Sequence, residues 1–90
     1  MRRVKVFAIG RDVFVRLYGI YGVDGVTVSS PEELLDKLRE VIRSEKADII
    51  VVDEELTKSV KEELTRIKFE NPLPLIVEME VKPIKPEFIP

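Results

Sequence analysis

Hydrophobic and polar residues alternate along the chain in two rhythms, which predict strands and helices in turn. Four short runs are rich in Val and Ile and are bounded by glycine, proline or charged residues, as is typical of buried strands. The longer segments between them repeat their apolar residues at the spacing of a helix. The predicted strands cover residues 4–9, 25–28, 47–52 and 75–77, and the predicted helices begin near residues 12, 31 and 54.

Two of the predicted helices have one apolar face each and a clear start signal. Ser30 precedes the second helix, and Glu33 completes a Ser-x-x-Glu capping box that pairs the first free backbone N–H groups. Asp53 is placed to cap the third helix, which is expected to run unbroken to Asn71. The predicted core residues are Leu34, Leu35, Leu38, Val41 and Ile42 in the second helix, and Leu56, Val60, Leu64 and Ile67 in the third.

The first predicted helix, residues 12–21, differs from the others because apolar residues nearly surround it. Asp12 is expected to be its N-cap. A helix that is apolar on every side is either enclosed by its own protein or docked against another one. Both coverings stay open here: a partner protein, or the chain's own residues 81–90. The apolar residues are Val13, Phe14, Val15, Leu17, Tyr18, Ile20 and Tyr21.

The alternation of strands and helices predicts an α/β fold with a parallel sheet. We expect a single doubly wound domain over residues 1–80, with a four-stranded sheet in the order 2-1-3-4. This is the flavodoxin-like or receiver-like topology, with helices on both faces of the sheet. Residues 81–90 contain three prolines and are expected to form an extended proline-rich tail.

Composition excludes several classes of function. The 90 residues carry a net charge of −2 with acids and bases interleaved, so no basic face for nucleic acid is expected. The chain has no cysteine and no histidine, which removes thiolate chemistry, the commonest general base and the commonest metal ligands. No apolar run approaches the roughly 18 residues of a membrane span. We therefore expect a cytoplasmic protein with no direct membrane insertion.

The carboxyl ends of the strands are where an open parallel sheet would bind a ligand. Gly10 follows the first strand, but neither glycine-rich phosphate-binding motif is present. Asp53 ends the third strand, where receiver domains carry a phospho-acceptor, yet the further carboxylates and the lysine needed beside it are missing. Glu78 and Glu80 are expected at a solvated strand end. The predicted role of Asp53 is a helix cap, with no catalytic, cofactor or metal site.

Several stretches, in the same order along the chain, resemble the F subunit of the V-type and archaeal-type rotary ATPases. Each is a short fragment that many α/β domains share, and the resemblance rests on their order and spacing. It departs from the family at a shorter loop after Gly10 and at a C-terminal helix that has no counterpart up to Pro90. The matching stretches are residues 7–10 (FAIG), 15–20 (VRLYGI), 30–33 (SPEE), 49–54 (IIVVDE) and 73–77 (LPLIV).

The resemblance implies a non-catalytic central-stalk (rotor) subunit that binds the coiled-coil D subunit and other ATPase subunits. Such a subunit couples ATP hydrolysis or synthesis to proton or sodium transport. The alternative is a degenerate receiver-like signalling domain with Asp53 as phospho-acceptor.

The first helix is the predicted partner surface, because Tyr and Arg are common interface anchors. The predicted partner-binding residues are Arg16, Tyr18, Ile20 and Tyr21, with Phe88 and Ile89 as a second contact.

Overall fold

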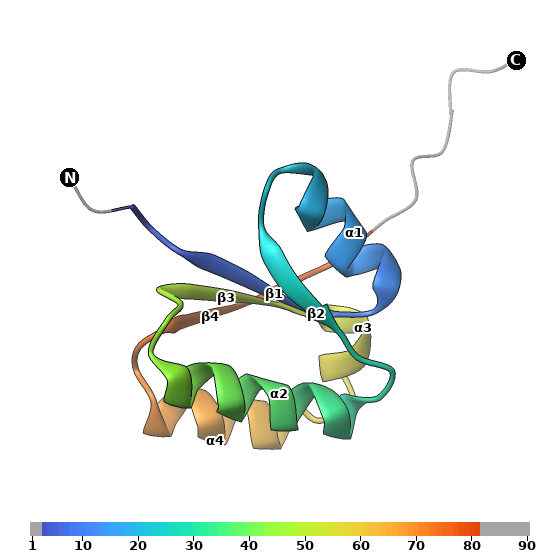
Figure 1. Cartoon of the computed structure of the whole chain (residues 1–90). Coiled ribbons are helices and arrows are strands. Elements are labelled where there is room, and N and C mark those ends of the chain that lie inside the picture. The colour runs from blue at the N-terminus through green and yellow to red at the C-terminus, as the bar shows by residue number, and fades with distance from the viewer. Residues whose placement is uncertain (1–2, 82–90) are drawn as a thin grey trace, which may run out of the picture.

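The computed structural model describes residues 3–81, along which strands and helices follow one another as expected (Figure 1). The four strands are β1 (Val6–Gly10), β2 (Asp24–Thr27), β3 (Ile49–Asp53) and β4 (Leu75–Met79). The four helices are α1 (Asp12–Ile20), α2 (Pro31–Ser44), α3 (Glu54–Thr57) and α4 (Lys61–Glu70).

All four strands are parallel and lie in the order β2-β1-β3-β4, which confirms the predicted topology. The register sets Ala8 of β1 beside Val51 of β3, and Val51 beside Val77 of β4. Because side chains alternate along a strand, these three residues share one face of the sheet. Their neighbours Ile9, Ile50 and Ile76 therefore point to the other face.

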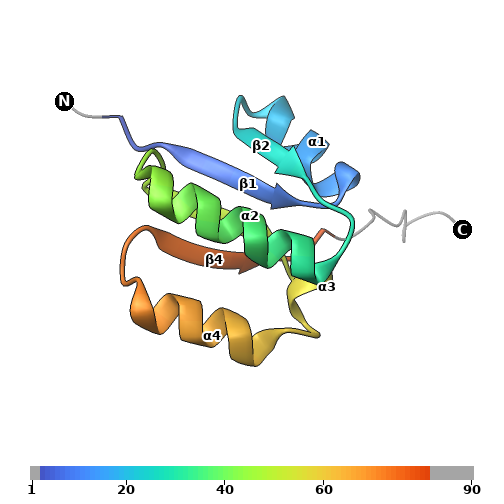
Figure 2. The ribbon, with the colours of Figure 1, turned by 60° about the horizontal axis from the view of Figure 1, so that its bottom comes forward.

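Helices lie on both faces of the sheet, as predicted, but they are divided unequally. Figure 1 shows α1 alone above the sheet, and Figure 2 shows α2 and α4 lying across the opposite face. The larger core is on the side of α2, α3 and α4, and the smaller one is under α1. The larger core contains Ile9, Leu34, Leu38, Ile50, Val52, Leu64 and Ile76, and the smaller one Ala8, Phe14 and Val51.

The capping box predicted for α2 is present. The Glu33 backbone N–H donates to Ser30 Oγ at 3.1 Å. The Glu33 carboxylate accepts in return from Ser29, through the backbone N–H at 2.7 Å and the hydroxyl at 3.1 Å. The return bond therefore reaches one residue further back than the usual capping box, in which the carboxylate pairs with the N-cap residue itself.

The prediction of one unbroken third helix is wrong, because the chain turns between α3 and α4. Val60 leaves the helical region with φ −130° and ψ 36°. The turn allows both Thr57 and Val60 to be buried. The hydroxyl of Thr57 donates a hydrogen bond of 2.9 Å to Glu78 on β4, which an uninterrupted amphipathic helix gives no reason to expect.

The prediction that Asp12 caps α1 is also wrong. Arg11 occupies the N-cap position, with no side-chain hydrogen bond to the helix, and Asp12 is the first helical residue. The Asp12 carboxylate instead forms an ion pair of 2.7 Å with Arg16 one turn later. The start of α1 is held by contacts with a different strand.

Candidate functional site

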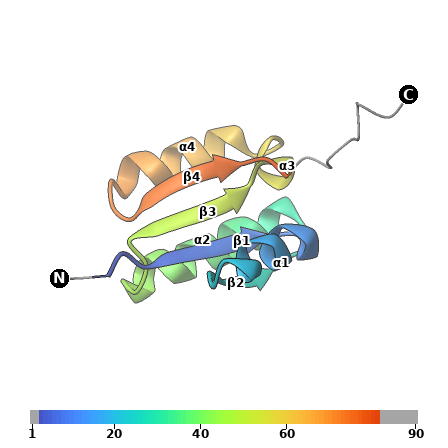
Figure 3. The ribbon, with the colours of Figure 1, turned by 90° about the horizontal axis from the view of Figure 1, so that it is seen from above.

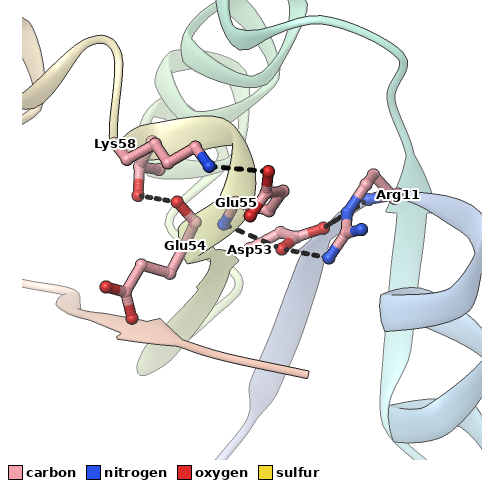
Figure 4. Close-up of polar contacts among 6 residues, drawn as sticks. Arg11, Asp53, Glu54, Glu55 and Lys58 are labelled. Carbon is pink, nitrogen blue, oxygen red and sulfur yellow. Dashed lines mark hydrogen bonds and ion pairs between the residues drawn. The ribbon is translucent and has the colours of Figure 1, made fainter. Parts of the chain in front are cut away.

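An open parallel sheet binds ligands at its carboxyl edge, and Asp53 ends the inner strand β3 at this edge (Figure 4). The side chain is completely buried. Its Oδ2 accepts hydrogen bonds from Arg11 Nε at 2.6 Å and from the Arg11 backbone N–H at 3.0 Å. Its Oδ1 accepts from Arg11 Nη2 at 3.1 Å and from the Glu55 backbone N–H at 3.2 Å. Asp53 therefore caps α3 as predicted and also holds Arg11, the N-cap residue of α1.

The charge of Asp53 is stabilised by these donors. Burial alone would raise the pKa of its carboxyl, but the Arg11 guanidinium and the two backbone N–H groups together hold that pKa below its ordinary value. Asp53 thus stays ionised. The sequence offered no sign that Arg11 would be its partner, because the two residues are far apart along the chain.

This geometry does not suit a phospho-acceptor. A nucleophilic carboxylate needs an oxygen open to the incoming phosphoryl group, whereas both oxygens of Asp53 are engaged and enclosed. Within residues 3–81, no group of three His, Cys, Asp or Glu side chains is arranged to hold a metal ion. The small cavity beside Asp53, about 160 Å³, is lined by both acidic and basic residues. The close-up shows Lys58 paired with Glu55 there (Figure 4).

Glu78 does not lie at a solvated strand end, contrary to the sequence expectation. Its Oε2 accepts from the Thr57 hydroxyl at 2.9 Å and from Lys61 Nζ at 2.8 Å, and its Oε1 accepts from Lys68 Nζ at 3.2 Å. Burial opposes ionisation, but these three donors together lower the pKa of Glu78 to about 2. The carboxylate therefore links β4 to both α3 and α4 through hydrogen bonds.

The second candidate site is the outer surface of α1. Val13, Leu17, Ile20 and the C-cap residue Tyr21 are all exposed, and Ile20 and Tyr21 are 77% and 79% exposed. Their spacing of four, three and one residues sets them along one side of the helix. We call these four residues the α1 stripe. They make up the largest group of exposed apolar side chains along one element among residues 3–81.

The predicted partner residues fall on different sides of this helix. Ile20 and Tyr21 belong to the α1 stripe, and the side chain of Arg16 is 80% exposed beside it. Tyr18 was expected on the same surface, but its side chain is half-buried and packs against the smaller core under α1. Its ring lies 4.9 Å from that of Phe14, and burial raises the pKa of its hydroxyl. Tyr18 is therefore a packing residue.

Val13 and Leu17 were missed as surface residues. The sequence did contain a pattern that could have identified them, since Val13 and Leu17 precede Ile20 at helical spacing. An apolar residue on a helix that is apolar all round cannot be assigned to the inner or outer side until the sheet-facing side is known. Phe14 defines that side: it is fully buried over Gly10, where an added Cβ would come within 2.7 Å of its ring. The other two predicted contacts, Phe88 and Ile89, lie outside the described residues.

The fold and its exposed side chains together define a small doubly wound α/β domain. Among the residues that the structure describes, the largest group of exposed apolar side chains lies on one helix and its cap. Among the described residues, no helix is both long and apolar enough to cross a bilayer.

Over residues 6–87 the chain matches the ATP synthase (F/14-kDa) subunit family, and it belongs to that family. The resemblance to the F subunit of V-type and archaeal-type rotary ATPases is thereby confirmed. A member of this family is one subunit of an ATPase complex and associates with other subunits of that complex. None of the curated proteins matches the chain.

Proposed function

We propose that this chain is a non-catalytic central-stalk subunit of a V-type or archaeal-type ATPase. In this role it binds the coiled-coil D subunit and turns with the rotor that couples ATP hydrolysis or synthesis to proton or sodium transport. The observation that carries the proposal is the α1 stripe, in a chain whose family is that of an ATPase subunit.

The α1 stripe suits a helical partner. Apolar residues that recur every three or four positions form the ridge by which one helix packs against another. Tyr21 and the neighbouring Arg16 are residue types that often dominate interface energy. A coiled coil presents long helices of the kind that such a ridge can contact.

The closed geometry around Asp53 supports a role without catalysis. The most buried carboxylate at the carboxyl edge of the sheet is fully engaged by Arg11 and by the start of α3. Its place in the fold is to join elements to one another. We place the protein on the cytoplasmic side of the membrane, as a peripheral part of the ATPase complex.

Binding to the isolated coiled-coil D subunit tests this proposal. Val13→Asp combined with Ile20→Asp introduces charge on the α1 stripe without touching the buried ring of Phe14. We expect the double variant to lose at least tenfold in affinity, about 1.4 kcal/mol, as measured by isothermal titration calorimetry.

The matched control is Phe69→Asp, because Phe69 is 88% exposed on α4, on the opposite side of the sheet. The control should bind like the parent chain. Equal binding by all three proteins, with unchanged melting curves, would show that α1 is not the docking helix.

A further inference from the structure

Beside α1 lies a second apolar surface, on the same side of the sheet. Leu75, Val77 and Met79 of β4 point to the face that α1 shares, since Ile76 between them points into the opposite core. Leu75 is 53% and Met79 39% exposed, and Val77 is half-buried. We call these three residues the open β4 face.

No helix within residues 3–81 covers this part of the sheet. Figure 3, seen from above, shows α1 over β1 and β2, while β3 and β4 are uncovered on the near side. The contacts of α1 agree, because it packs against β1 and β2. The opposite face is covered by α2 and α4 (Figure 2). Within residues 3–81, the sheet therefore has one helix fewer over these strands than the usual two-sided arrangement.

The α1 stripe lies on the side of the helix that borders this open face. Phe14 and Tyr18 point down to the sheet. Val15, on one flank, reaches β2, where its Cγ1 would lie 3.2 Å from a Cβ on Gly25. At 3.6 residues per turn, Val13 and Leu17 lie on the opposite flank of the Phe14–Tyr18 side. That flank faces away from β2 and toward β3 and β4.

The dimensions of the open surface fit one helix. Neighbouring strands are about 4.8 Å apart, so β3 and β4 together are about as wide as a helix with its side chains. Two packed helices lie about 8–10 Å apart, which places a neighbour of α1 directly over these strands. A helix in that position would contact the α1 stripe on its side and the open β4 face beneath it.

We infer that the α1 stripe and the open β4 face form one docking surface, which receives a single amphipathic helix of the coiled-coil partner. The inference rests on the proposed function and extends it. A docked helix would cover β3 and β4 beside α1. Its apolar side would contact both the α1 stripe and the open β4 face. Contact with β4 distinguishes this arrangement from a docking mode that uses the outer side of α1 alone.

Two sets of variants separate the inference from the proposed function. Leu75→Lys with Met79→Lys charges the open β4 face, and Phe69→Lys with Leu73→Lys is the control at exposed apolar positions outside that face. Calorimetry with the coiled-coil D subunit should show at least a tenfold loss for the first pair and less than a twofold change for the second, about 1.4 and 0.4 kcal/mol.

The pattern of losses decides the outcome. Loss with the β4 pair and with the charged α1 stripe supports a single docking surface. Loss with the α1 stripe alone overturns the inference but leaves the proposed function in place. Loss with neither overturns the inference and shows that α1 is not the docking helix, whereas the proposed function is overturned only if the parent chain fails to bind D. Loss with the β4 pair alone contradicts a surface shared with α1.

A methyl probe tests which molecule covers the face. Met79 is one of two methionines in the chain, so its ¹³C-labelled methyl group gives a signal that Met79→Leu assigns directly. The coiled-coil D subunit should shift this signal, whereas deletion of residues 82–90 should leave it in place. The inference is overturned if the deletion shifts the signal as D does, which would mean that the chain covers its own face. A shift that follows the chain's own concentration would assign the face to a second copy and overturn it as well.

Discussion

Replacing Asp53 by alanine should destabilise the domain far more than the loss of a helix cap. A cap alone is worth about 1 kcal/mol. Asp53 also pairs with the Arg11 guanidinium through both carboxylate oxygens and accepts from the Arg11 backbone N–H. The carboxylate therefore joins β3, the start of α1 and the start of α3.

The magnitude follows from what each donor loses. Hydrogen bonds to a charged group contribute about 1.5–3 kcal/mol, and a buried N–H left without a partner costs about 1–3 kcal/mol. Water can compensate part of this loss, because the side chain of Arg11 is 38% exposed and regains hydration once it is released. We expect the free energy of unfolding to fall by roughly 3 kcal/mol in Asp53→Ala.

Urea unfolding at neutral and acidic pH measures the free energy of unfolding of Asp53→Ala. Arg11→Ala, which removes the other half of the ion pair, is measured beside it. Removing Arg11 leaves burial to raise the pKa of Asp53, so that Asp53 takes up a proton at a higher pH than in the parent chain. The stability gap between Arg11→Ala and the parent should therefore narrow as the pH falls. A loss of 1 kcal/mol or less in Asp53→Ala would refute the reasoning, since it would leave only the cap.

Three further expectations concern stability. The pKa of Glu78, about 2, is below the ordinary value of 4.5, so its stabilisation is complete above pH 4.5 and is lost as the pH falls toward 2. Glu78→Gln should lower the free energy of unfolding by on the order of 2–3 kcal/mol at pH 7. In chemical unfolding, the variant should also lose less stability than the parent chain between pH 4.5 and pH 2, and an equal loss would contradict the ion pairs of Glu78. Leu38→Ala, in the larger core, should cost about 2–4 kcal/mol and Val51→Ala less, and a near-neutral Leu38→Ala would contradict the burial of α2. Glu45 ends α2 at φ 56°, so Glu45→Gly should raise the melting temperature by relieving about 1 kcal/mol of backbone strain, and a lower melting temperature would argue against that conformation.

The strand order and the buried face of α2 could be predicted from the sequence because each depends on local patterns. Val and Ile runs separated by amphipathic segments leave few topologies for a parallel sheet. The Ser30 cap was predicted for the same reason, since its hydrogen bond joins residues three positions apart.

The errors arose where contacts distant in sequence decide the local structure. Arg11 rather than Asp12 is the N-cap residue of α1, and Asp53 holds Arg11 from another strand. The turn before α4 brings Thr57 to Glu78, a partner 21 residues away. Neither interaction leaves a periodic signal in the sequence.

The sequence could single out α1 as a helix with more apolar residues than one buried side needs, but it could not tell which of its sides is exposed. A helix with apolar residues nearly all round has no polar side that marks the direction of solvent. The structure resolves this through Phe14, which fits over Gly10 and turns Tyr18 inward. Val13 and Leu17 are turned outward by the same constraint.

Site-specific crosslinking within the assembled ATPase tests the central claim most directly. A photoreactive amino acid at Ile20 should form a covalent product with the coiled-coil D subunit when the intact complex is irradiated. The same amino acid at Phe69, which is even more exposed than Ile20 but lies on the other side of the sheet, should give no such product. A D-subunit crosslink from position 69 and none from position 20 would contradict the account.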